Sequence, residues 1–134
     1  MNLPPVSILL LEDDPDLARM VTMSIEKNGG YSVTAIGEGK AGLKAGIVGS
    51  FDLCLLNVNL PDLSGFEIAE ELQRRGSDMP LMFLTGAHKA DVAEWARKQE
   101  FRVAYLQHPC SVSGLLQKIE EVLGGKGWLE VDRT

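Results

Sequence analysis

The sequence is poor in cysteine and has no long hydrophobic run. Only two of its 134 residues are cysteines, Cys54 and Cys110, which is too few for the disulfide framework of a small secreted protein. The longest apolar runs, such as Ile8–Leu11, have the length of a strand and fall far short of the roughly 20 residues of a membrane span. The first residues, Met1–Pro5, lack the charged and apolar regions of a signal peptide. We therefore expect a cytoplasmic protein with reduced thiols and no contact with a membrane.

Positive charge is also scarce. The sequence has 13 Lys and Arg residues against 19 Asp and Glu residues, so its formal net charge is −6, and no basic stripe is present. This balance argues against direct binding of nucleic acid. The hydrophobic share of 45% is that of an ordinary globular protein, and the length is that of one domain. We expect one domain over residues 1–123, followed by a tail or linker over residues 124–134.

Five short apolar segments are the predicted strands. Four of them are nearly continuous in apolar residues, as strands buried on both faces should be. Tyr31–Ile36 alternates more, which is typical of an edge strand. The five segments are Val6–Leu11, Tyr31–Ile36, Leu53–Val58, Leu81–Thr85 and Val103–Leu106.

Helical patterns separate these segments and follow the last one. Asp14-Pro15 is a typical helix start, and the spacing from Ser64 to Glu67 is that of a capping box. Glycines disfavour the helix in the middle of the sequence, because each costs about 0.8–1 kcal/mol relative to alanine in a helix interior. The remaining helices are predicted around Ala41–Val48, over Asp91–Gln99 and over Val112–Leu123.

The alternation of strands and helices predicts a parallel sheet with helices on both faces. Two five-stranded arrangements are usual, the flavodoxin-like order and half of a dinucleotide-binding fold. The first strand is followed by Glu12-Asp13-Asp14-Pro15 and not by a glycine-rich loop, and these carboxylates would repel a pyrophosphate. We therefore predict a flavodoxin-like (βα)5 three-layer sandwich with a parallel five-stranded sheet in the order 2-1-3-4-5.

Polar residues follow several predicted strands, at the edge where open α/β sheets place their sites. Glu12 and Asp13 follow the first strand, and adjacent carboxylates favour a bound cation because they raise each other's pKa. An all-oxygen site suits Mg²⁺. The plain alternative is a solvated acidic turn, and Asp14 has the position of a helix cap. The other candidates at this edge are Asn57, Asn59, Thr85, Tyr105 and His108.

The candidates belong to longer segments that form a recognisable pattern. The segments are Ile8-Leu9-Leu10-Leu11-Glu12-Asp13-Asp14-Pro15, Asn57-Val58-Asn59-Leu60-Pro61-Asp62-Leu63-Ser64-Gly65, Leu84-Thr85-Gly86-Ala87 and Tyr105-Leu106-Gln107-His108-Pro109. Over Val6 to Leu123 the chain resembles the receiver domain of two-component response regulators, of the chemotaxis-regulator type. The resemblance implies a signalling module that is not an enzyme. Its partners would be a sensor histidine kinase, a phosphotransfer protein or an output domain.

In that family an aspartate at the end of the third strand accepts a phosphoryl group, and Mg²⁺ is held beside it. Carried over to this sequence, Glu12 and Asp13 are the acidic pair, and Asn59 supplies a metal-binding backbone carbonyl. Thr85 is the hydroxyl that contacts the phosphoryl group, and Tyr105 is the switch aromatic. Receivers often pair through the face of the fourth helix, fifth strand and fifth helix, so the resemblance also allows a homodimer through that face.

Two positions depart from the family pattern. Asn57 stands at the phospho-acceptor position, and His108 stands where the family has lysine. Because an amide is neutral and a poor nucleophile, we expect no phosphorylation at Asn57 and only weak binding of Mg²⁺. The residues that would hold this ion are Glu12, Asp13, Asn57 and Asn59. The family's carboxylate and lysine are both absent, so the loss of one negative and one positive charge leaves the charge of the site balanced. This favours natural divergence over a laboratory change at position 57.

The sequence leaves three interpretations. The first is a receiver-like domain that is not phosphorylated at Asn57 and acts as a protein-interaction module. The second is an ordinary phospho-accepting receiver that carries an engineered Asp-to-Asn change at this position. The third, of another class, is a small flavodoxin-like flavin protein, which the acidic loop after the first strand disfavours.

Overall fold

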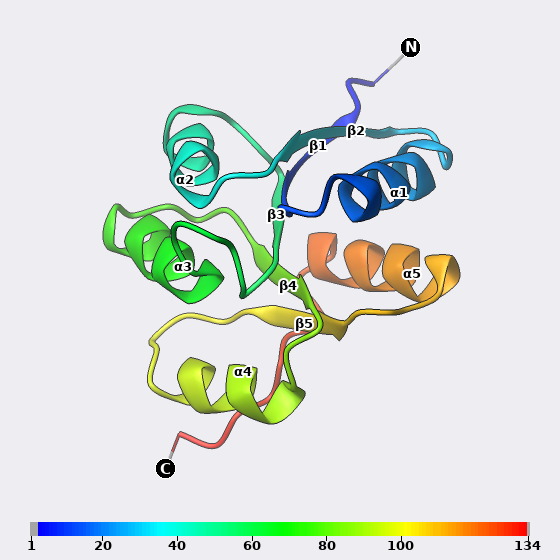
Figure 1. Cartoon of the computed structure of the whole chain (residues 1–134). Helices are drawn as coiled ribbons and strands as arrows, with labels where there is room; N and C mark the ends of the chain where they lie inside the picture. Colours follow the sequence, from blue (N-terminus) through cyan, green and yellow to red (C-terminus); the bar gives the residue numbers. More distant parts are fainter. Residues whose placement is uncertain (1–2, 134) are drawn as a thin grey trace.

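The computed structural model describes residues 3–133, in which five strands and five helices alternate along the chain (Figure 1). The elements are β1 Val6–Leu11, α1 Pro15–Glu26, β2 Tyr31–Ile36, α2 Gly39–Val48, β3 Leu53–Leu56, α3 Gly65–Arg74, β4 Leu81–Thr85, α4 Lys89–Arg97, β5 Ala104–Gln107 and α5 Val112–Leu123. The Asp14 side chain caps α1, and Ser64 and Glu67 form the expected capping box of α3. Across the described residues, no helix has both the length and the apolar character needed to span a membrane.

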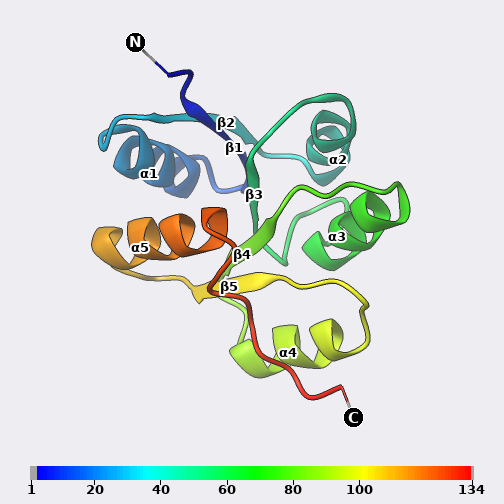
Figure 2. The same cartoon turned by 180° about the vertical axis from the view of Figure 1, so that it is seen from behind.

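The strands form a parallel sheet in the order β2-β1-β3-β4-β5. In β1, Ile8 pairs with Val33 of β2 on one side and with Leu53 of β3 on the other. Helices α1 and α5 cover one face of the sheet, and α2, α3 and α4 cover the other (Figures 1 and 2). This is the flavodoxin-like three-layer sandwich, so the predicted fold class and strand order are confirmed.

The sheet separates two hydrophobic clusters. On one side, Ile119 of α5 packs with strand residues such as Leu55. On the other side, Leu72 of α3 packs with strand residues such as Phe83. Because β1, β3 and β4 lie inside the sheet and are covered on both faces, their sequences are almost wholly apolar.

Strand β3 is shorter than predicted and ends at Leu56. The backbone of Val58 makes its hydrogen bonds outside the sheet: its N–H donates to Oγ1 of Thr85 at 3.4 Å, and its carbonyl accepts from the N–H of Gly65 at 2.8 Å. Strand β5 also shifts by one residue, since the carbonyl of Val103 accepts from the N–H of Leu129 at 2.8 Å. Both shifts reflect contacts between residues distant in sequence.

Helix α2 forms despite its glycines, and it begins at Gly39. Gly42 faces β1 so closely that a Cβ at this position would lie 2.4 Å from Cδ2 of Leu11. The glycine therefore lets the helix backbone approach the sheet. This close packing offsets the low helix propensity that made the segment doubtful from its sequence.

Helix α4 spans Lys89–Arg97 and so begins and ends two residues earlier than predicted. Its start is set by the carbonyl of His88, which accepts from the N–H groups of Asp91 and Val92 at 3.0 and 3.3 Å. After α5, residues 124–133 turn back and pass β5, whereas residue 134 lies outside the described residues.

Candidate functional site

The carboxyl ends of four strands bring the predicted polar residues to one edge of the sheet. Glu12 follows β1, Asn57 follows β3, Thr85 ends β4 and His108 follows β5. Backbone hydrogen bonds hold these ends together. The N–H of Asn57 donates to the carbonyl of Leu11 at 3.1 Å, and the N–H of His108 donates to the carbonyl of Thr85 at 2.8 Å. The strand order alone therefore assembles the site.

The carboxamide of Asn57 lies at the centre of a hydrogen-bond network. Its Nδ2 donates to Oε1 of Glu12 at 3.2 Å, and its Oδ1 accepts from Oγ1 of Thr85 at 2.6 Å. The same Oδ1 accepts from the backbone N–H of Asn59 at 3.3 Å. Both lone pairs of the amide oxygen are thus engaged. The side chain is held between the ends of β1 and β4.

Thr85 determines the orientation of the Asn57 carboxamide. Its Oγ1 accepts from the backbone N–H groups of Val58 and Ala87 at 3.4 and 3.2 Å. Because a hydroxyl has one proton and two lone pairs, the Thr85 proton is left for Asn57. The group that faces Thr85 must be an acceptor, so the amide NH₂ faces the carboxylate of Glu12. A carboxylate at position 57 would bring two anions together at this contact.

Glu12 and Asp13 lie in different environments although they are adjacent. Glu12 is 6% exposed, and its Oε2 accepts from the N–H of Asp14 at 3.0 Å, whereas Asp13 is exposed. Burial raises the pKa of Glu12 above its usual value, and the neighbouring Asp13 adds to this. The N–H of Asp14 and the amide of Asn57 act in the opposite direction. Hydrogen bonds from Asp14 and Asn57 therefore favour the charged form of the buried Glu12 carboxyl, whereas burial disfavours it.

Oxygen atoms of the kind that Mg²⁺ prefers lie together at this edge of the sheet. In the part of the chain that the structure describes, no group of three or more His, Cys, Asp or Glu side chains could hold a metal ion. Two carboxylates and the amide of Asn57 are present, and oxygen ligands are the ones Mg²⁺ prefers. However, both oxygens of Glu12 and Oδ1 of Asn57 already accept hydrogen bonds. The oxygen atoms are of the kind that Mg²⁺ prefers, but a cation would displace some of these bonds.

A hydrogen-bonded path continues from Thr85 to Tyr105. The N–H of Ala87 donates to Oγ1 of Thr85 at 3.2 Å, and the carbonyl of Ala87 accepts from the hydroxyl of Tyr105 at 2.6 Å. Tyr105 is 9% exposed, and burial raises its pKa. The residue predicted as the switch aromatic is therefore turned inward, and Ala87 connects it to Thr85.

His108 and Asn59 lie at the rim of the arrangement. His108 is half-buried, and a cis peptide bond joins it to Pro109. Asn59 is exposed, and its N–H is turned toward the side chain of Asn57. The structure thus brings the predicted residues to one edge of the sheet. It places Glu12, Asn57 and Thr85 in direct hydrogen-bond contact.

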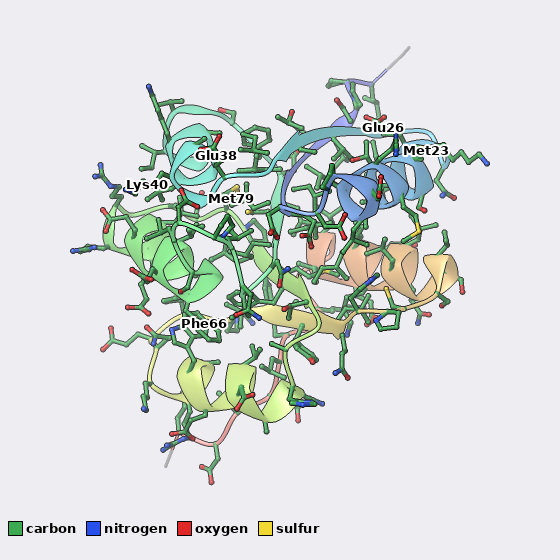
Figure 3. The ribbon with its side chains drawn as sticks, viewed as in Figure 1. Met23, Glu26, Glu38, Lys40, Phe66 and Met79 are labelled. Atoms are coloured by element: carbon green, nitrogen blue, oxygen red, sulfur yellow. The ribbon has the colours of Figure 1, made fainter. Side chains whose placement is uncertain are left out.

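Sequence reasoning missed the role of Asp62 in the loop after Asn57. The Asp62 carboxylate accepts from the N–H groups of Lys40 and Gly39 at 3.0 and 2.7 Å, and these bonds lower its pKa. Figure 3 labels Glu38 and Lys40, the residues on either side of Gly39 at this end of α2. Glu38 provides no side-chain cap, so Asp62 caps α2 from another loop. The sequence signal for this contact was the lack of a typical capping residue just before α2.

Gly65, the last residue of the motif that begins at Asn57, also shapes the site. A Cβ at this position would lie 2.2 Å from the carbonyl oxygen of Asn57. No side chain fits in that space, so glycine allows α3 to begin directly against the strand end that carries Asn57.

Comparisons with known proteins agree with this geometry. A model of the response regulator receiver domain matches residues 8–120. The transcriptional regulatory protein RprY of Bacteroides fragilis is 32% identical over 120 residues, and the match covers 87% of this chain and 48% of that protein. The transcriptional activator protein PfeR of Pseudomonas aeruginosa is 32% identical over 124 residues, with 92% and 39% covered. This chain thus spans about half the length of these curated relatives, or less.

The fold is also found among solved structures. The crystal structure of a CheY-like response regulator receiver domain protein from Methanospirillum hungatei matches with a TM-score of 0.80 and 25% identity. The match covers 90% of this chain and 95% of that one. Of the interpretations left open by the sequence, these findings favour a receiver over a flavin protein. The chain belongs to the response regulator receiver domain family of two-component signalling.

Proposed function

We propose that this chain is a receiver domain that does not accept a phosphoryl group at Asn57 and that acts by binding a protein partner, with no enzymatic turnover of its own. The observation that carries the proposal is the 2.6 Å hydrogen bond from Thr85 to the amide oxygen of Asn57. In the receiver family the corresponding hydroxyl contacts the phosphoryl group. Here the hydroxyl proton already has an acceptor in the unmodified side chain.

The chemistry of the amide supports the first part of the proposal. A carboxylate attacks phosphorus through a charged oxygen with a free lone pair, whereas the amide nitrogen lone pair is delocalised and the oxygen is neutral. The oxygen of Asn57 also accepts hydrogen bonds from Thr85 and Asn59. These features leave the side chain without a usable nucleophile.

The switch residues support the second part. Tyr105 is buried and bonded to the carbonyl of Ala87, and Ala87 is bonded in turn to Thr85. We infer that this path holds one conformation without phosphorylation, so that partner binding is constitutive or depends on another input. The partner class is a sensor histidine kinase, a phosphotransfer protein or an output domain. RprY and PfeR are named as regulators of transcription, which favours an output domain.

Mg²⁺ has a minor part in this proposal. Glu12, Asp13, the side chain of Asn57 and the backbone carbonyl of Asn59 would hold the ion. Mg²⁺ usually binds through carboxylates together with phosphate oxygens, and a neutral amide at position 57 contributes no charge. We therefore expect weak binding, with no function in phosphoryl transfer.

The second candidate is an ordinary phospho-accepting receiver with an engineered Asp-to-Asn change at position 57. His108 is the observation that argues against it, because a change at position 57 alone would leave the family lysine in place. Loss of the lysine together with loss of the carboxylate keeps the charge of the site balanced. The gene that encodes the chain would separate the two candidates directly.

The test is incubation of the full chain with acetyl phosphate and Mg²⁺, followed by measurement of the intact mass. We expect no added phosphoryl group. The matched control is Asn57→Asp under the same conditions, which we expect to gain one group. A titration of the unchanged chain with Mg²⁺, followed by tryptophan fluorescence or calorimetry, should show binding no tighter than about millimolar, since one anionic ligand is missing.

A stoichiometric phosphoryl group on the unchanged chain, mapped to the edge of the sheet that carries Asn57, would overturn the proposal. Submillimolar Mg²⁺ binding would contradict the assigned ligand set, because it would require a further anionic ligand.

A further inference from the structure

The segment that follows α5 lies along the open edge of the sheet. β5 is the last strand in the sheet order, so one of its edges has no neighbour among the five parallel strands. Trp128 forms an antiparallel bridge with Ala104, and the N–H of Leu129 donates to the carbonyl of Val103 at 2.8 Å. In Figure 2 the red segment runs from α5 across β5 and toward α4. The chain thus covers part of its own sheet edge.

The side chains of this segment alternate as those of a bound strand do. Leu129 and Val131 are half-buried and pack against the cluster on the α4 side of the sheet, whereas Glu130 and Asp132 are exposed. Trp128 packs against the cluster on the opposite side. The segment therefore crosses the edge of β5 and contacts both layers of the core.

The buried cluster against which Leu129 and Val131 pack is also contacted by a group of packed aromatic rings. Trp95 of α4 stacks on Phe66 of α3, with their ring centroids 4.7 Å apart, and meets Phe101 edge-to-face at 5.7 Å. Phe66 is labelled in Figure 3, at the side of α3 nearest α4. These contacts hold α4 against α3 and the loop before β5, beside the cluster that the segment contacts.

Charged groups hold the two ends of the segment. The guanidinium of Arg102 lies 4.7 Å from the centroid of the Trp128 ring, at the beginning of the segment. At the other end, the Arg133 guanidinium donates to the carbonyl of Phe101 at 3.2 Å and to that of Ala96, near the end of α4, at 3.5 Å. A cation is favoured there because the carbonyls at a helix C-terminus carry partial negative charge.

We propose that the edge of β5 and the adjoining surface of α4 bind an extended peptide segment, and that Trp128–Arg133 of this chain is the resident ligand. A competing ligand needs apolar side chains at alternate positions and a basic residue at its end. A second copy of this chain that pairs through the same face must first displace the segment. The proposal is independent of the chemistry at Asn57, so the two can fail separately.

The short connection makes occupation by the chain's own segment favourable. Four residues, 124–127, separate α5 from Trp128. A short flexible tether gives an effective concentration of about 1 mM, so a segment with an intrinsic dissociation constant of about 0.1 mM fills its site in roughly nine molecules of ten. A free peptide of the same sequence then binds about tenfold more weakly than it would to an empty site.

The test uses the full chain and a synthetic peptide of residues 126–133. The double variant Leu129→Ser/Val131→Ser removes the two apolar contacts of the resident segment and should leave the site open. Amide shifts of β5 in NMR titrations should show that the peptide binds this variant about tenfold more tightly than the unchanged chain. Glu130→Gln, at an exposed position of the same segment, is the matched control and should behave as the unchanged chain.

Equal affinity for the double variant and the unchanged chain, or no binding to either at millimolar peptide, would overturn the proposal. Hydrogen exchange on the unchanged chain gives a second measurement if the double variant does not fold. The amide of Leu129 should exchange at least tenfold more slowly than in the free peptide. Exchange at the rate of the free peptide would also overturn the proposal.

Discussion

The two halves of the site differ in how far they depart from the family pattern. The acid half, Glu12, Asp13 and Asn57, carries a neutral amide where the family has the phospho-acceptor. The switch half, Thr85, Ala87 and Tyr105, has a complete hydrogen-bonded path. The halves meet at the bond between Asn57 and Thr85. The hydrogen-bonded path from Thr85 to Tyr105 is thus formed beside an amide at the family's phospho-acceptor position.

The largest change is expected when the acid half is returned to the family pattern. Asn57→Asp should accept a phosphoryl group from a small donor, because Mg²⁺ and a carboxylate suffice for the attack. It should shift α4 and β5 only partly, since the His108 side chain is shorter than that of a lysine and lacks the flexible stem that carries the lysine ammonium. Adding His108→Lys should strengthen the response. Amide NMR shifts upon phosphorylation or beryllofluoride addition would measure both variants.

His108→Lys in the unchanged background is the control for this series, and it should give no response to either reagent. Equal and complete responses of the single and double variants would show that His108 is no handicap. The residue at position 57 would then be the only departure from the family pattern that affects the response.

The next largest effect is expected from Thr85→Val, which breaks the bond between the two halves. The change removes the acceptor of the Val58 and Ala87 N–H groups and the donor to Asn57, all at a buried position. Unsatisfied buried polar groups of this kind cost about 1–3 kcal/mol, so urea unfolding should show a loss of that order. Thr85→Ser retains the hydroxyl and is the matched control. A Thr85→Val variant as stable as Thr85→Ser would contradict the assigned network.

The smallest effect concerns Glu12 and is a dependence on pH. Its pKa in the folded protein is raised, mainly by burial, from the ordinary value of 4.5. The contribution of Glu12 to the free energy of unfolding is therefore present below pH 4.5. It is lost as the pH rises through the pKa that Glu12 has in the folded protein. Because Glu12→Gln removes this loss, the stability of the variant relative to the unchanged chain should increase as the pH rises above 4.5.

Glu120→Gln, at an exposed position of α5, is the control for this comparison and should show no such trend. Thermal unfolding over the pH range would provide the data. A relative stability of Glu12→Gln that stays constant or falls with rising pH would contradict a raised pKa for Glu12.

Predictions from the sequence succeeded where the signal was local or periodic. The apolar runs of β1 and β4 and the caps at Asp14 and Ser64 each lie within a few residues, so the elements and their order could be inferred. The edge that holds the candidate site followed from the strand order, because the carboxyl ends of parallel strands meet at one edge.

The sequence did not reveal contacts between distant residues. Asp62 caps a helix that begins 23 residues earlier, and Leu129 bonds to a carbonyl just before β5. Neither contact leaves a periodic pattern, since each depends on how loops cross the finished sheet. The orientation of the Asn57 amide likewise depends on the donors of Val58 and Ala87, which occupy the acceptor sites of Thr85.

Hydrogen bonds anchor the loop after Asn57 and so lower the conformational entropy that binding at this edge of the sheet would cost. Within this short loop, the carbonyl of Val58 accepts from Gly65, Asp62 is bonded to the start of α2, and Ser64 caps α3. A loop tied at three points has little conformational freedom to lose when a partner or an ion arrives. Recognition here therefore begins from an ordered surface, and affinity depends mainly on the contacts that the incoming group makes.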